Sequence, residues 1–516
     1  MEYVGGMNLN NKIKIITLTL FTSLLTLVGC DNSSSWEPGE NAIEGAIQPT
    51  NTNPTGELSD LNKMRISQNN FGLPSKGNPN ILVVPLTFKN DVVVEKATGL
   101  DLTFDDKDIA DINQLFFGED KVNLHSSVKS YYKKSSYGQL NIDGVVTPKL
   151  TYTEEFLDLV ENVTYGTKTI EGVKEDILNF VYDKLFIETK TYNPEHFDSN
   201  KDGKIDSVHI VFNFPYYLAV TDDNNMTLSL HSLLTTLEPI FSSSLCEDTL
   251  FNSATLNSYG YYENNQYGAY SRIPISLIGN IIGLDSYADM VGTSDGLFRA
   301  PTGFVDMMDG YVGDHSAFSK YQLGWIDPTV VSKNDIPLNQ GMEVKLSKLE
   351  KEGDALILCL DDEHTPFSEY LILEYYSPTG LNQMDASIMF KKAGIKVTHV
   401  DARLLRGYGD VYLPYDEEFD FDAEITLSNN EKVKYVYDYR HTNNYYNNYL
   451  DYGITSNNPL CLTLSKDGMN RHATSSSYGL SDEDLFHVND TFGSDDQIEG
   501  FYKDFAFYDA ELLGIE

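Results

Sequence analysis

Short apolar runs of strand length, alternating with amphipathic segments, constrain the fold of this chain more than any other feature. Residues 81–88 (ILVVPLTF) and 208–214 (VHIVFNF) have the length and composition of buried β-strands. Apolar residues recur every fourth position across residues 173–186, which predicts a helix with one buried face. A further helix is predicted over residues 126–134, followed by a strand over 140–146. This alternation continues to about residue 327 and predicts an α/β or α+β unit.

The pattern changes beyond Pro328, where strand-like runs are separated only by turns. These runs cover residues 342–346, 355–360, 370–376, 395–400, 425–427 and 460–464. Such spacing predicts a β-rich, sandwich-like domain over residues 331–516, following a first domain over 79–330.

The N-terminus has the pattern of a secretory signal. Lys12 and Lys14 precede an apolar run over residues 15–28, which is too short to count as a membrane-spanning helix. The run ends in Leu27-Val28-Gly29-Cys30, which resembles a bacterial lipobox and implies a diacylglycerol on Cys30. Residues 1–30 are therefore predicted to be a lipoprotein signal peptide. A plain signal peptide with an incidental cysteine is the alternative.

Residues 31–78 are rich in Ser, Asn, Pro and Gly, and this composition predicts a flexible tether. No other run approaches the length of a membrane span, so the lipid would be the only membrane attachment. The predicted location is the extracytoplasmic face of the cell membrane.

The chain has 77 acidic and 37 basic residues and a formal net charge of −40. This charge opposes binding of nucleic acid and of anionic lipid, but it is compatible with binding of cations. None of the four cysteines lies in a CxxC pair, which excludes zinc ribbons and thioredoxin-type chemistry. Cys246, Cys359 and Cys461 are too scattered for a disulfide framework. The last two lie in apolar runs and are expected to be buried thiols.

The sharpest local motif of the mature chain is DSNKDGKID at residues 198–206. Its oxygen-bearing side chains and Gly203 match the first part of an EF-hand loop, which favours calcium. Position 12 is His209 instead of Glu, and a strand follows instead of a helix. An Asx-rich turn without metal is the alternative. The predicted calcium ligands are Asp198, Asn200, Asp202, the carbonyl of Lys204, and Asp206.

Several segments in a fixed order share the pattern of one protein family. They are residues 127–140 (SVKSYYKKSSYGQL), the acidic loop at 198–206, His231, residues 316–325 (SAFSKYQLGW) and residues 394–401 (GIKVTHVD). Met307-Met308-Asp309 falls where that family has its Met-turn. Together they resemble the immune inhibitor A family of secreted zinc metallopeptidases over roughly residues 80 to 405. The resemblance implies a zincin-like domain, and the predicted fold class is α+β with a β-rich second domain.

The family's defining helix reads HEFGHxLGLPD, and the corresponding stretch here is SLIGNIIGLDS at residues 276–286. Ser276 and Asn280 occupy the positions of the two zinc histidines, Leu277 that of the general-base Glu, and Ser286 that of the third ligand. Two His four apart and a neighbouring carboxylate are what this chemistry needs, and the helix offers neither.

No two of the ten His residues are four positions apart, so no second helix of this type exists elsewhere in the sequence. A buried apolar helix is therefore expected near residues 275–284, and zinc is not expected. A zinc site assembled from Asp285, Asp289 and a distant His is the alternative.

Other catalytic assignments have less support. His399 and Asp401 are expected to be strand residues, and Glu374 fits the family's LLEYR strand although Tyr376 replaces its Arg. No G-x-S-x-G elbow is present, which argues against Ser/His/Asp hydrolysis.

These observations predict a lipid-anchored, calcium-stabilised surface protein with a metallopeptidase-like fold that is catalytically inactive and binds peptide or protein. One alternative is an active zinc metalloendopeptidase with an atypical metal site. Another is a solute-binding or adhesion lipoprotein.

Overall fold

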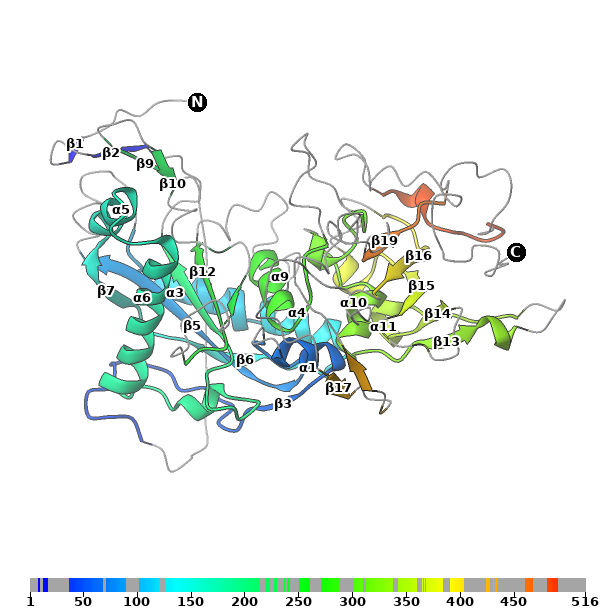
Figure 1. The fold of residues 1–516 in the computed structure, drawn as a ribbon, viewed down its shortest axis with the longest axis horizontal. Coiled ribbons are helices and arrows are strands. Elements are labelled where there is room, and N and C mark those ends of the chain that lie inside the picture. Colours follow the sequence, from blue (N-terminus) through cyan, green and yellow to red (C-terminus); the bar gives the residue numbers. More distant parts are fainter. Residues whose placement is uncertain are drawn as a thin grey trace. The chain divides into compact units, whose positions relative to one another are not determined.

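The chain folds as a mixed α and β protein with several sheets (Figure 1). The computed structural model describes residues 8–9, 13–16, 37–67, 71–89, 102–119, 126–213, 219–222, 227–229, 236, 239–241, 250–259, 271–287, 301–309, 312–336, 342–359, 364, 366, 368–383, 390–402, 424–426, 430, 432–434, 460–466 and 480–490.

Contacts divide the chain into two compact units that are not consecutive in sequence. The first comprises residues 1–57, 69–133 and 140–282, and the second comprises residues 58–68, 134–139 and 283–516. The main division at 282/283 differs from the boundary predicted near residue 330, which stays a prediction of domain organisation.

The first unit is built on a six-stranded, mostly parallel sheet with β5 (Asn80–Lys89) at its centre. Parallel strands that are covered on both faces consist of continuous apolar residues, which explains the run at residues 81–88. The neighbours of β5 are β6 (Asp143–Val146), β7 (Leu150–Glu155) and β8 (Val208–Phe212), all parallel to it, while β12 (Ser253–Ser258) is parallel to β8 and β11 (Ile240–Phe241) is antiparallel to β12.

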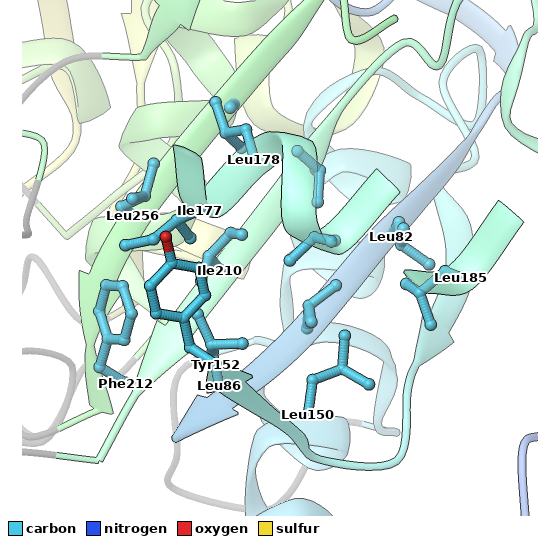
Figure 2. Close-up of a cluster of buried hydrophobic side chains, with 14 of the residues drawn as sticks. Leu82, Leu86, Leu150, Tyr152, Ile177, Leu178, Leu185, Ile210, Phe212 and Leu256 are labelled. Atoms are coloured by element: carbon cyan, nitrogen blue, oxygen red, sulfur yellow. The ribbon is translucent and has the colours of Figure 1, made fainter. Parts of the chain in front are cut away.

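Helix α6 (Ile170–Tyr182) packs its apolar face on this sheet (Figure 2). Thr169 caps the helix, because its Oγ1 accepts from the Gly172 N–H at 3.0 Å. A π-helical segment, Asp183–Glu188, continues α6 and includes buried Leu185. The predicted helix over residues 173–186 is confirmed, with a change of helical type near its end.

The core between α6 and the sheet includes Leu82, Leu86, Ile177, Leu178, Ile210, Phe212 and Leu256 (Figure 2). Two further helices of the first unit are α3 (Asp106–Phe117) and α5 (Phe156–Thr164). Asp105 is the N-cap residue of α3 and forms a capping box with Asp108.

Residues 128–133 of helix α4 (Val128–Ser135) contact helix α9 (Arg272–Ile281) within the first unit. The buried Tyr132 hydroxyl donates to the carbonyl of Ile275 at 2.6 Å. This bond fixes the first half of α9, the helix predicted near residues 275–284.

A separate four-stranded sheet has the order β1 (Asn8–Leu9), β2 (Ile13–Ile16), β9 (Ala219–Asp222) and β10 (Thr227–Ser229). Two of these strands come from the predicted signal segment. Cleavage before Cys30 would therefore leave only β9 and β10 of this sheet.

The second unit contains a five-stranded sheet. It is antiparallel except where β13 (Thr329–Ser332) runs parallel to β14 (Ala355–Cys359). The other strands are β15 (Glu369–Tyr376), β16 (Gly394–Asp401) and β19 (Cys461–Thr463), and a separate pair is formed by β17 (Glu424–Thr426) and β18 (Lys432–Lys434).

These strands confirm five of the six runs predicted beyond Pro328. The sixth prediction, a strand at residues 342–346, is wrong, because this segment has no regular structure. Met342 and Val344 are 48% and 36% exposed, so these apolar side chains do not pack against a core. Short helices α10 (Ala317–Gln322) and α11 (Leu349–Glu352) also belong to this unit.

Part of the segment predicted as a flexible tether is ordered. Its described residues contain β3 (Thr55–Glu57), α1 (Asp60–Ser67) and β4 (Lys76–Asn78), and β3 pairs with β4. Met64 of α1 is fully buried, which provides the anchoring that the polar composition does not suggest. Within the described residues, every helix is too short or too polar to cross a bilayer.

Candidate functional site

Helix α9 carries the residues that correspond, by sequence resemblance, to the zinc motif of the immune inhibitor A family. Ser276 and Asn280 lie one turn apart on the same side of the helix and are half-buried. Leu277 is only 3% exposed and is buried like Ile278 and Ile281. The helix therefore presents a hydroxyl, an alkyl group and an amide at these three positions. A hydroxyl and a neutral amide are poor zinc ligands, and an alkyl group accepts no proton.

Asp285, the carboxylate that follows α9 most closely in sequence, belongs to a partly buried ion pair of the second unit. Arg65 Nη2 lies 2.7 Å from Asp285 Oδ1, and the Arg65 side chain is 3% exposed. The same guanidinium donates to the Gly283 carbonyl at 2.8 and 3.0 Å. A zinc site built on Asp285 would have to compete with this arginine. Ser286 is half-buried, and Asp289 lies outside the described residues.

The predicted calcium loop closes on itself through its own carboxylates. Asp198 accepts from the Asp202 N–H at 3.1 Å and from the Gly203 N–H at 2.8 Å. Asp202 accepts in turn from the Lys204 N–H at 2.8 Å. Gly203 has a φ of 86°, a conformation that favours glycine and makes the turn possible.

Asp206 is the buried end of this loop. Its side chain is fully buried, and Oδ2 accepts from both the N–H and the hydroxyl of Ser199. Oδ1 has no hydrogen-bond partner among the described residues. Burial, together with the charges of Asp198 and Asp202, raises the pKa of Asp206 well above its usual value, against the hydrogen bonds from Ser199.

The donor set fits a hard cation. A cation bound by the loop would compensate the orphaned oxygen of Asp206 and the mutual repulsion of the three carboxylates. Among the described residues, no three His, Cys, Asp or Glu side chains already converge as a metal centre. Binding would therefore have to draw the carboxylates inward, with Asn200 and the Lys204 carbonyl as the further predicted ligands.

Asp202 is held from outside the loop as well. Its Oδ2 accepts from Asn200 Nδ2 at 2.9 Å and from Asn252 Nδ2 at 2.7 Å. Asn252 immediately precedes β12 and is far from the loop in sequence, so the motif gives no indication of it.

His209, at position 12 of the motif, belongs to the core. It lies on β8, is fully buried, and its Nδ1 is 2.8 Å from Thr255 Oγ1. Burial lowers the pKa of His209 to about 3. It is therefore a neutral core histidine at physiological pH.

Sequence reasoning did not predict a group of buried charges in the second unit, here named the charge cluster. Every side chain in it is at most 5% exposed. Its members are Asp306, Asp309, Asp314, His315, Lys320, Glu374 and Lys396.

Two of the ion pairs in the charge cluster are close. Lys320 Nζ lies 2.8 Å from Asp314 Oδ2, and Lys396 Nζ lies 2.9 Å from Glu374 Oε1. Lys320 also donates to the Ser135 carbonyl at 2.6 Å. The cluster therefore connects Ser135, in the motif segment at residues 127–140, with Lys320, in the motif segment at residues 316–325.

The charge cluster also fixes the start of α10. Asp306 accepts from the Ser316 N–H at 2.8 Å and from the Ser319 hydroxyl at 2.7 Å. Glu374 accepts from the Ala317 N–H at 2.7 Å. Carboxylates at this end of a helix satisfy its free N–H groups.

Asp306 and Asp309 differ in their surroundings. Burial alone would raise the pKa of Asp306, but His315, whose Nδ1 lies 3.5 Å from Oδ1, and the N–H and O–H groups that donate to the carboxylate outweigh it and lower the pKa. Burial and the charge of Asp306 raise the pKa of Asp309 well above its usual value. Asp309 Oδ1 has no hydrogen-bond partner among the described residues. The cluster is closed to solvent, which suits a structural role.

The remaining candidates are structural. His399 lies on β16, is fully buried, and its Nε2 is 3.0 Å from Glu369 Oε1. Asp401 ends the same strand. Cys359 and Cys461 are buried free thiols, as predicted. Cys30, Cys246 and His231 lie outside the described residues.

Comparison with known proteins adds no further evidence on family. No protein-family model and no curated protein matches the chain. The resemblance to the immune inhibitor A family therefore depends on the segments quoted from the sequence.

Proposed function

We propose that this chain is a lipid-anchored surface protein with a zincin-like metallopeptidase fold, that it does not hydrolyse peptides, and that it binds peptide or protein. The observation that supports the proposal best is the surface of α9. Ser276 and Asn280 are half-buried at the positions of the two zinc ligands, and Leu277 is part of the core.

The residues on α9 can support neither of the two requirements of metal-assisted hydrolysis. A zincin needs a metal-bound water and a carboxylate that takes its proton. Leu277 has no group that accepts a proton, and Ser276 and Asn280 are weak donors to zinc. We place the ligand-binding surface at Ser276 and Asn280, the two half-buried polar residues at these positions of α9.

Calcium has a structural role in this proposal. Asp198, Asp202 and Asp206 would hold the ion with Asn200 and the Lys204 carbonyl, and the ion would neutralise repulsion among the carboxylates. Asp206 supports this assignment because its buried Oδ1 has no other partner among the described residues.

The test of lost catalysis uses the full mature protein. Elemental analysis is expected to find no stoichiometric zinc, and casein is expected to remain intact with or without phenanthroline. Zinc near one per chain, with proteolysis lost in phenanthroline and restored by added zinc, would establish the alternative of an active metalloendopeptidase.

Ligand binding is tested by selecting peptides from a displayed library on the immobilised protein. We expect Asn280→Arg to weaken binding of the selected peptides, because a long, charged side chain would replace the amide at the proposed binding surface of α9. Asn179→Arg on the exposed side of α6 is the matched control and should leave binding unchanged. Equal binding by both variants would exclude this face as the peptide site.

The anchor is tested separately. Cys30→Ser is expected to move the protein from the membrane fraction to the soluble fraction, since the thiol that carries the lipid is gone. Retention of the variant on membranes after a high-salt wash would exclude the lipid anchor.

A further inference from the structure

We propose that Asn252 and Ser253 couple the calcium loop, residues 198–206, to the last turn of α9. Asn252 acts as a positioning residue for Asp202, and Ser253 transmits the state of the loop to Ile281. This inference rests on the proposed calcium site and adds to it a route by which the ion regulates α9.

The first step joins the loop to the start of β12. Asn252 Nδ2 donates to Asp202 Oδ2 at 2.7 Å, and the Asn252 N–H donates to the Ile205 carbonyl at 2.8 Å. The Ile205 N–H donates to the Leu250 carbonyl, also at 2.8 Å. Asn252 is 5% exposed, so its amide has little water to exchange these bonds with. A turn of the Asp202 carboxylate toward an ion would therefore act directly on Asn252.

The second step is made by the next residue. The Ser253 hydroxyl donates to the Asp206 carbonyl at 2.9 Å, and Ser253 is fully buried. Asn252 and Ser253 thus bind two different predicted ligand residues of the same loop. The two bonds link the ligand residues to one short stretch of backbone.

The third step passes through Gly72. A Cβ atom on Gly72 would lie 2.6 Å from Ser253 Oγ and 2.3 Å from Ile281 Cγ2, so only glycine fits between them. The Leu73 N–H donates to the Ile281 carbonyl at 3.3 Å. Close packing of this kind transmits displacements because no void can absorb them.

The consequence concerns the helix that carries Ser276 and Asn280. If calcium binding favours the ordered state of the last turn of α9 by a given factor, then ordering of that turn must strengthen calcium binding by the same factor. A peptide bound on α9 would then also tighten calcium binding.

Hydrogen exchange of the full mature protein, with and without calcium, tests the coupling. Opening that requires loss of the ion becomes rarer by the factor 1 + [Ca²⁺]/Kd, about 100-fold at a hundredfold excess over Kd. We expect a slowing of this order at the Leu73 amide and at the amides of the last turn of α9, as well as in the loop.

Ser253→Ala is the decisive variant. It should keep the slowing within the loop but lose most of it at Leu73 and in α9, because the bond to the Asp206 carbonyl is gone. Thr255→Ala is the matched control: it removes a buried hydroxyl from the same strand, bonded there to His209, and should leave the slowing intact. Asn252→Ala provides a second variant and is expected to weaken calcium binding measured by calorimetry.

The outcomes separate the two proposals. If calorimetry detects no calcium binding to the unmodified protein, the calcium site is wrong. If calcium binds and slows exchange in the loop, but exchange at Leu73 and in α9 is unchanged, the coupling is wrong and the calcium site stands. Equal slowing in Ser253→Ala and Thr255→Ala would also overturn the assigned route.

Discussion

Removal of the Lys396 charge is expected to destabilise the second unit strongly. Lys396 and Glu374 face each other on β16 and β15, with 2.9 Å between Nζ and Oε1. Their side chains are 1% and 5% exposed, so Lys396→Met would leave a buried carboxylate without its counter-charge. Loss of one partner from such a pair costs about 3–5 kcal/mol in free energy of unfolding.

A second substitution separates the charge from the packing. Glu374 also accepts from the Ala317 N–H at 2.7 Å, and a Gln at this position keeps an oxygen for that bond. Lys396→Met combined with Glu374→Gln is therefore expected to recover at least about half of the lost stability, because replacing both charges by neutral groups is often close to neutral.

The chain itself supplies the probe for this experiment. It has two tryptophans, and Trp325 is buried in the second unit, so a Trp36→Phe background leaves a fluorophore that reports on this unit alone. With a urea m-value of about 1–3 kcal/mol/M, the midpoint of Lys396→Met should fall by about 1 M or more.

Lys351→Met is the matched control, since Lys351 forms an exposed pair with Glu352 in the same unit. Its midpoint is expected to equal that of the parent, because exposed pairs contribute little. A Lys396→Met midpoint no lower than this control, or a double variant no more stable than Lys396→Met, would refute the buried-charge argument.

Three further predictions concern the calcium loop, the charge cluster and α9. Millimolar calcium should raise the melting temperature, by the equivalent of about 2.7 kcal/mol at a hundredfold excess over Kd, and Asp202→Ala should remove most of the rise; identical melting in EDTA and calcium would contradict this. Because the folded state raises the pKa of Asp309, it binds a proton that the unfolded state releases, so stability should fall as pH rises above the usual pKa of Asp. Asp309→Asn should remove that decline in the Trp325 urea midpoint, and equal pH slopes would refute it. Leu277→Glu should lower stability by several kcal/mol relative to Leu277→Met, because it buries a carboxyl group without a partner; equal stabilities would show that this position is not in the core.

Elements whose signal is local in sequence could be predicted from the sequence. The run at residues 81–88 is confirmed as β5, and the fourfold spacing over 173–186 is confirmed as α6. The failure at residues 342–346 has a physical reason, since alternation predicts a strand only if a partner covers the apolar side. The polar composition of residues 31–78 likewise gave no indication of α1. The order of this helix depends on buried Met64 and on the contact of Arg65 with the distant Gly283.

The predicted calcium loop illustrates the same limit of prediction at a candidate site. Its proposed ligands lie within nine residues, so Asp198, Asn200, Asp202 and Asp206 could be proposed from their spacing alone. The hydrogen bond from Asn252 to Asp202 joins residues fifty positions apart, and no local sequence pattern predicts such a contact.

The motif segments and the positions that the resemblance equates with a zinc motif differ in the charges that they bury. Lys320 of the SAFSKYQLGW segment pairs with Asp314, and Glu374 of the strand that fits LLEYR accepts from the Ala317 N–H. These motif residues carry buried charges, so replacing any one of them would leave its partner unpaired. Leu277, by contrast, is a buried apolar residue of α9 and carries no charge. The proposal of a metallopeptidase-like scaffold without hydrolysis agrees with this difference, because fold and chemistry depend on different residues.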